Sequence, residues 1–154
     1  MGIPAELVAP ITVDLRADDN TFNIIKGLEH LNYEDFKMDT PSQTINPGMW
    51  VKKTATGCLL ADGTTLPLYP VVVGNNEYDS IATGNVTVII GYGWIYSTTQ
   101  FSGSSFTIGA LLTVDSTSKL EVADDTDPIV AKVYAYDAVK GVLTVEVLPC
   151  MQAA

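Results

Sequence analysis

Short apolar runs, separated by Gly, Asp, Asn, Ser and Pro, make up the chain from residue 49 onward. The runs are rich in β-branched and aromatic residues, which is typical of strands rather than helices. Their spacing of roughly eight to twelve residues predicts a small antiparallel β-sandwich or a barrel-like domain. The predicted strands are Met49–Ala55, Cys58–Leu60, Thr64–Val73, Val86–Gly91, Gly93–Thr98, Phe106–Val114, Lys119–Val122, Ile129–Tyr136 and Val142–Leu148.

The last two of these strands predict a hairpin with one fully apolar face. Asp137–Gly141 supplies a connection of hairpin length between them. In the final strand Leu143, Val145 and Val147 share one face because side chains alternate along a strand. We expect this hairpin to form the stable core of the domain. An earlier strand is less regular, since Pro67 and Pro70 predict that Thr64–Val73 is an edge strand or an interrupted one.

The N-terminal 46 residues differ from the β-rich body at residues 47–154. Met1–Asp19 contains Pro4 and Pro10 and suits an extended segment. We expect residues 1–46 to form an arm that binds another protein or a neighbouring protomer, since its apolar content is large for a tail left in water; the alternative is a poorly ordered tail. The apolar side chains of this arm are Ile3, Leu7, Val8, Ile11, Val13 and Leu15.

A short helix is the second feature predicted for the arm. Phe22, Ile25 and Leu28 follow one another at near-helical spacing within Asn20–Leu31. Gly27 weakens this helix, and no capping box precedes it.

Length and charge limit the partners of the chain. At 154 residues it is long enough for one domain with its own core. The formal net charge of −10 disfavours binding to nucleic acid and to anionic lipid. No apolar stretch is long enough for a membrane span, and the first residues do not resemble a signal peptide. We therefore expect assembly in a cytoplasm.

The sequence offers little catalytic chemistry, and we predict neither an enzyme nor a cofactor. His30 is the single histidine and lies in the acidic arm, and no Gly-x-Ser-x-Gly motif is present. Two cysteines and one histidine give no zinc spacing. Cys58 and Cys150 can pair only if their strands meet, and a buried free thiol is the ordinary role for Cys58. The carboxylates of residues 115–127 do not match a calcium loop, so a solvated acidic turn is the simpler reading.

Three aromatic residues stand at alternate positions in Gly91–Tyr96. Tyr92, Trp94 and Tyr96 would share one face of a strand. Such rigid aromatics are typical of a subunit or partner interface, and equally of a core. The sequence is compatible with both an interface role and a core role for these three residues.

Three groups of short sequence motifs follow one another in the second half of the chain. They are Gly74–Ser80 with Thr83–Ile90, Thr107–Val114 with Lys119-Leu120, and Asp127–Lys132 running into Gly141–Val145. Their order resembles that in the small capsid decoration (cement, head-stabilisation) proteins of tailed bacteriophages. The resemblance covers about half the chain, from Gly74 to Leu148, and Ser118 stands where a glycine before Lys119 is expected.

The resemblance implies a structural protein that binds the outer surface of an expanded phage capsid and bridges coat subunits. Its partner would be the major capsid protein, and such proteins are often trimers. Two alternatives remain: another virion part, such as a head fibre base or a tail-tube component, or a carbohydrate-binding β-sandwich that stacks sugars on Tyr92, Trp94 and Tyr96.

Overall fold

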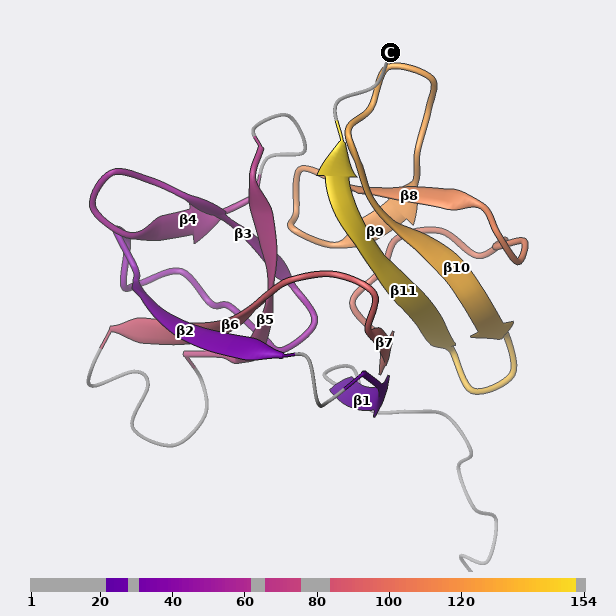
Figure 1. The fold of residues 1–154 in the computed structure, drawn as a ribbon, viewed down its shortest axis with the longest axis horizontal. Helices are drawn as coiled ribbons and strands as arrows, with labels where there is room; N and C mark the ends of the chain where they lie inside the picture. Colours follow the sequence, from indigo (N-terminus) through magenta and orange to yellow (C-terminus); the bar gives the residue numbers. More distant parts are fainter. Residues whose placement is uncertain (1–21, 28–30, 62–65, 76–83, 152–154) are drawn as a thin grey trace, which may run out of the picture.

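The computed structural model of the chain describes residues 22–27, 31–61, 66–75 and 84–151. These residues form eleven strands and no helix. The prediction of a small antiparallel β fold is confirmed: the strands form two antiparallel sheets that do not close into a barrel, consistent with a small sandwich. Figure 1 shows the two sheets next to each other, with β3 and β5 of one nearest β11 of the other.

The larger sheet has six strands. It contains the first and the last five of the described strands, so segments far apart in the sequence lie in one sheet. In spatial order the strands are β1 (Phe22–Lys26), β7 (Ile95–Thr98), β11 (Val142–Met151), β10 (Ile129–Asp137), β8 (Leu111–Val114) and β9 (Leu120–Val122).

The smaller sheet has five strands from the middle of the chain. At one end its edges approach each other, because Met38 forms an isolated bridge with Cys58. In spatial order the strands are β2 (Asn32–Lys37), β6 (Asn85–Ile90), β5 (Leu68–Val73), β3 (Trp50–Lys53) and β4 (Cys58–Leu60).

The predicted C-terminal hairpin is confirmed. β10 and β11 pair over most of their length, with Val133 opposite Val145 and Lys132 opposite Glu146. Leu143, Val145 and Val147 are buried, whereas the residues between them are only partly covered. One face of the hairpin therefore supplies much of the core, as its alternation predicts.

The main core lies between the two sheets. Buried apolar side chains of β10 and β11 pack there with Trp50, Leu68 and Ile89 from the smaller sheet. The Trp50 indole, buried in this core, donates a hydrogen bond of 3.0 Å to the Tyr96 hydroxyl. A buried donor with no acceptor is costly, so this bond satisfies both polar groups where the sheets meet.

A second core covers the opposite face of the smaller sheet. Val51, Val71 and Val88 point into it from β3, β5 and β6. Ile45 and Met49, which precede β3 in the chain, pack onto the same cluster. The smaller sheet is thus buried on both faces at its centre, while the larger sheet faces solvent over part of its outer side.

The predicted helix at Asn20–Leu31 is wrong over its described residues. Phe22–Lys26 is β1, which pairs with β7 and places Phe22 and Ile24 against the core. Asn23 and Ile25 point the other way and are exposed, so the burial has a period of two. Gly27, at φ +91°, then ends the strand where it passes close to Trp94.

Two described segments of residues 1–46, Phe22–Lys26 and Asn32–Lys37, are strands of the two sheets. β1 is an edge strand of the larger sheet and β2 an edge strand of the smaller one. β2 gives a weak sequence signal because, of its six residues, Phe36 alone is buried. Such polar edge strands are common because charged side chains discourage pairing with other chains.

Of the predicted strand Thr64–Val73, the structure forms β5 from Leu68 onward, so Pro67 precedes the strand and Pro70 lies within it. The edge-strand alternative is wrong. β5 lies between β6 and β3. Pro70 is opposite Trp50, and the pairing with β6 is recorded from Val71 onward. The missing N–H of Pro70 therefore falls outside the paired register with β6, which allows a proline in a central strand.

Candidate interaction surface

The predicted arm residues Ile3, Leu7, Val8, Ile11, Val13 and Leu15 lie outside the described residues, and so does His30. Of the predicted sites, the structure therefore places the three aromatic residues alone.

Two of these three aromatics belong to the core. Trp94 and Tyr96 are buried, and their rings stack at 4.9 Å between centroids. Phe22 of β1 packs against the Tyr96 ring at 5.0 Å. Burial strongly raises the pKa of the Tyr96 hydroxyl, while the Trp50 indole opposes that rise through its hydrogen bond. Neither ring is available to stack a sugar or a partner.

The third aromatic, Tyr92, is an exposed side chain, with 66% of its surface open to solvent. The backbone conformation around Tyr92 explains why Tyr92 is exposed while Trp94 is buried. Gly91 and Gly93 have φ of +122° and +89°, which interrupts the strand before β7 begins. The alternation that would place Tyr92 on the Trp94 face is therefore lost.

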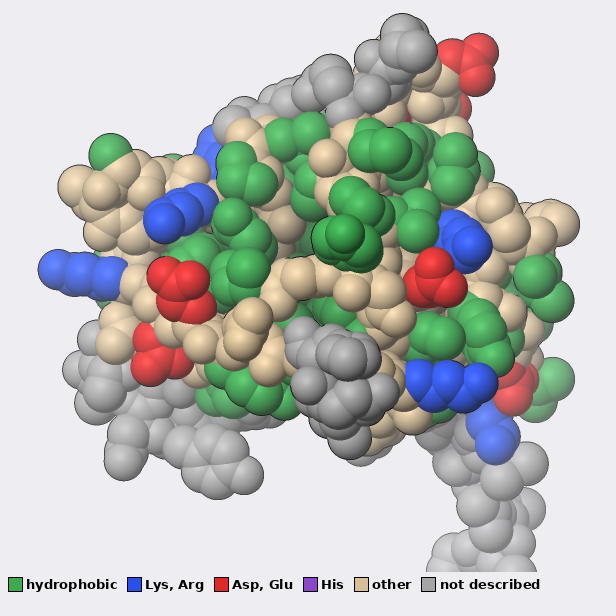
Figure 2. All heavy atoms as spheres, in the orientation of Figure 1, with side chains coloured by type: hydrophobic (Ala, Val, Ile, Leu, Met, Phe, Trp, Pro, Cys, Tyr) green, Lys and Arg blue, Asp and Glu red, His purple; other side chains and the backbone are tan. Residues whose placement is uncertain are grey.

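Tyr92 borders an apolar groove between the smaller sheet and β11 of the larger one, here called the seam groove. It has a volume of about 180 Å³, and no Lys, Arg, Asp or Glu lines it. Figure 2 shows hydrophobic side chains gathered on this side of the molecule, over the region where the sheets meet. The lining residues are Trp50, Pro67, Leu68, Tyr69, Pro70, Ile89, Gly91, Tyr92, Val147, Leu148, Pro149 and Cys150.

Backbone hydrogen bonds tie the segment that carries Tyr92 to β11, which forms one wall of the seam groove. The amide of Gly93 donates to Val147 at 2.8 Å, and the amide of Val147 donates to Trp94 at 2.9 Å. The Cys150 thiol contacts the carbonyl oxygen of Leu68 at 3.5 Å, and burial raises the pKa of that thiol. A preformed, neutral, apolar groove beside an exposed tyrosine is suited to an apolar part of a protein partner.

The seam groove was not predicted, because its walls come from strands far apart in sequence. One sequence feature could have indicated part of it. In Gly91-Tyr92-Gly93 two glycines interrupt the strand and leave the tyrosine exposed.

The acidic segment 115–127 consists of β9 with a turn on either side of it. Asp115 accepts hydrogen bonds from the Ser102 hydroxyl and from the hydroxyl and amide of Thr117. Burial disfavours its charge, but these bonds hold the pKa of Asp115 below its ordinary value. Glu121 has a raised pKa, first from burial and then from neighbouring carboxylates. Over the described ranges no group of three or more His, Cys, Asp or Glu could hold a metal ion.

Both cysteines are free thiols. Cys58 is buried in the second core, and Cys150 lines the seam groove. The two thiols therefore lie in separate environments, and the ordinary role for Cys58 is confirmed.

Among the described residues, none forms a helix of the length and apolarity that crossing a membrane requires. The chain matches no protein-family model and no curated protein.

Proposed function

We propose that this chain is a structural protein of a phage virion, which binds the outer surface of the expanded capsid and bridges coat subunits. The observation that carries the proposal is the seam groove with Tyr92 exposed at its border. The resemblance of Gly74–Leu148 to capsid decoration proteins supports it independently.

The proposed mechanism is adhesion without turnover. An apolar coat segment enters the seam groove, and Tyr92 packs against it, so water leaves apolar surface on both partners. The two sheets hold the groove in place before binding, which lowers the entropy lost on association. Residues 1–21 extend the contact to a neighbouring coat subunit or protomer.

Repetition and charge add to this adhesion. Each copy makes modest contacts, but many copies, or the subunits of a trimer, act on one shell. The net charge of −10 keeps unbound protein soluble and complements basic patches on the coat protein. The protein then resides on the capsid exterior after assembly in the host cytoplasm.

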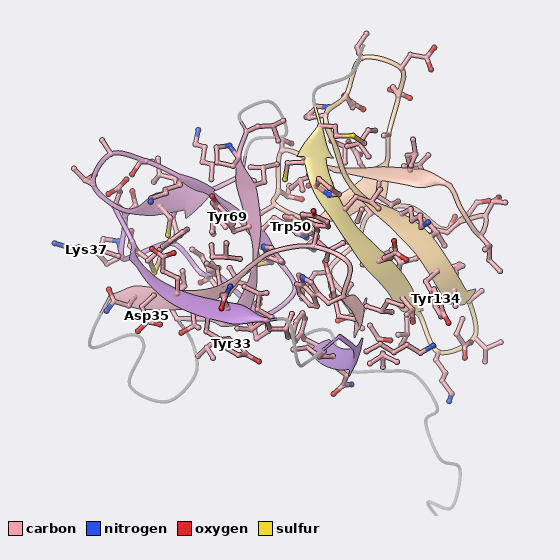
Figure 3. The ribbon with its side chains drawn as sticks, in the orientation of Figure 1. Tyr33, Asp35, Lys37, Trp50, Tyr69 and Tyr134 are labelled. Atoms are coloured by element: carbon pink, nitrogen blue, oxygen red, sulfur yellow. The ribbon has the colours of Figure 1, made fainter. Side chains whose placement is uncertain are left out.

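The test is co-sedimentation with expanded capsids made from the coat protein of the same genome. We expect the full chain to sediment with the capsids, and Tyr92→Ala to weaken binding by about tenfold or more. Tyr33→Ala is the matched control, because Tyr33 is another exposed tyrosine, on β2 and away from the groove (Figure 3). A full chain that stays in the supernatant would refute the proposal.

A second variant examines the N-terminal segment. A deletion should end before Phe22, because β1 begins there and pairs with β7. We expect a chain that starts at residue 21 to fold and to bind capsids more weakly. Full binding by this chain would remove the segment from the mechanism and leave the groove.

An alternative to capsid decoration is another virion part, and electron micrographs of the purified protein distinguish the two. Rings or tubes would indicate a tail-tube component, whereas single particles or trimers agree with decoration.

A further inference from the structure

A trough lies on the solvent side of the larger sheet, away from the seam groove. Three small side chains form its floor on adjacent strands: Ser97 of β7 is opposite Thr144 of β11, which is opposite Ala135 of β10. Larger side chains surround this floor, so a hollow of about 390 Å³ remains. The lining residues are Asn23, Ile25, Ser97, Ala135, Tyr136, Asp137, Lys140, Val142 and Thr144.

A contact between distant strands flanks the trough. Lys26 of β1 and Tyr134 of β10 are separated in the sheet by β7 and β11. The Lys26 ammonium nevertheless donates to the Tyr134 hydroxyl at 3.4 Å and lies 5.6 Å from the centre of its ring. Tyr134 is an exposed side chain and is labelled on β10 in Figure 3. Ile25, which precedes Lys26, and Ala135, which follows Tyr134, line the trough.

Hydrogen-bonding groups stand in the floor and along the rim. The hydroxyls of Ser97 and Thr144 lie 2.7 Å apart. Only one of their two hydrogens can serve that bond, so the other can be donated to a third atom. At the rim, Oδ1 of Asp137 accepts the amides of Val139 and Lys140, and a carboxylate can accept further bonds at its second oxygen.

The trough therefore combines apolar walls with a few polar groups of both kinds. Ile25 and Val142 present hydrocarbon, and Asn23 presents an amide. Asp137 and Lys140 bring opposite charges, so the rim is close to neutral. The volume is in the range of about 300–1,000 Å³ that is usual for sites of small ligands.

We propose that this trough binds a neutral saccharide. A pyranose ring has an apolar face, which suits Ile25 and Val142, and a rim of hydroxyls, which suits Asn23, Asp137 and the Ser97–Thr144 pair. A phosphorylated or nucleic-acid ligand is disfavoured, because the net charge of −10 repels it and the rim has no surplus of cations. This site is independent of the proposed capsid binding, since it lies on other residues than the seam groove.

The experiment is a glycan array of neutral hexose and N-acetylhexosamine oligosaccharides, probed with the full chain. We expect the protein to bind a defined subset of these oligosaccharides. Ala135→Leu fills the floor of the trough and should weaken this binding by about tenfold or more. Thr144→Val keeps the shape but removes a hydroxyl, and it should also weaken binding. The matched control is Lys132→Ala, which changes an exposed residue of β10 that pairs with Glu146 outside the trough.

An independent readout locates the site. Amide NMR spectra recorded with methyl glycosides of glucose, galactose, mannose and N-acetylglucosamine should shift at Ser97, Ala135 and Thr144. Silence on the array together with unchanged spectra overturns the proposal. Hits that survive both Ala135→Leu and Thr144→Val, in proteins with an unchanged near-ultraviolet circular dichroism spectrum, overturn it as well. Capsid binding by the Ala135→Leu variant should be unchanged, so the two proposals fail separately.

Discussion

The Trp50 indole and the Tyr96 hydroxyl form a buried hydrogen bond that joins the two sheets. Trp50 comes from β3 of the smaller sheet and Tyr96 from β7 of the larger one, and each side chain is almost fully buried. The donor N–H and the acceptor hydroxyl have no access to water, so each depends on the other.

Removing the hydroxyl should therefore destabilise the protein although the ring remains. Tyr96→Phe leaves the Trp50 N–H without its acceptor, and we expect a loss of about 1–3 kcal/mol in the free energy of unfolding. Urea unfolding measured by tryptophan fluorescence gives this value. Tyr33→Phe, at a tyrosine that is 57% exposed, should change stability by less than about 0.5 kcal/mol. Equal effects of the two substitutions would contradict this account.

Ser118 combines a strained backbone with a buried hydrogen bond. Its φ is +67°, where glycine is favoured, and its hydroxyl donates to the Ala61 carbonyl at 3.1 Å. Ser118→Ala keeps the strain and loses the bond, so we expect a loss of about 1–3 kcal/mol. Ser118→Gly also loses the bond but relieves the strain, so its cost should be smaller by about 1 kcal/mol. Thermal and urea unfolding of both variants measure this order, and a glycine variant less stable than the alanine variant would refute it.

Gly57 lies where two segments approach closely. A Cβ atom at this position would overlap the backbone carbonyl of Lys37, which lies at the end of β2. Gly57→Ala must therefore push β2 away from β4, and we expect it to cost about 3 kcal/mol or more. Gly141→Ala is the comparison, since φ is +69° there but no atom lies within 4 Å. It should cost about 1 kcal/mol, the penalty for the left-handed backbone alone. Denaturant unfolding measures both costs. If the two substitutions lowered the free energy of unfolding by similar amounts, the close approach of Gly57 to Lys37 would not explain the cost of Gly57→Ala.

The raised pKa of the Cys58 thiol predicts that the protein loses stability at alkaline pH. Burial in the first place, and the nearby Asp39 carboxylate, raise the pKa of Cys58 from 9.0 to about 11. The Cys58 thiol ionises at a lower pH in the unfolded chain than in the folded protein. Its contribution to the free energy of unfolding is therefore complete below pH 9.0 and declines as the pH rises toward 11. Free energies of unfolding between pH 8 and 11 should therefore fall less steeply in Cys58→Ala than in the parent protein.

The control for this experiment is Val86→Ala. Val86 is buried in the same core, but it cannot ionise. This variant should be less stable at every pH and should keep the alkaline slope of the parent. If Cys58→Ala kept that slope too, the thiol would not be its source.

The sequence predicted the fold wherever burial alternated along a strand. Leu143, Val145 and Val147 are a clear case, because local alternation and long-range packing agree. β1 was missed because Phe22 and Ile25 also fit a helical period over so short a segment. Its strand conformation comes from pairing with β7, which is a long-range contact. β2 was missed because only Phe36 of its residues is buried.

The candidate surfaces were harder to predict than the fold. Tyr92 and Trp94 look equivalent in the sequence, yet the positive φ angles of Gly91 and Gly93 separate them into surface and core. The trough depends on three small residues from strands that are distant in the chain. No local pattern of Ser97, Ala135 and Thr144 could reveal that they would meet.

The burial of the smaller sheet on both faces also determines how the protein unfolds. Leu68 and Val71 both belong to β5, but the first packs in the main core and the second in the core on the opposite face. β5 cannot separate from its partners unless both cores open together. Amide hydrogens in the middle of this strand should accordingly exchange with solvent only through global unfolding, which couples the two sheets into a single cooperative unit.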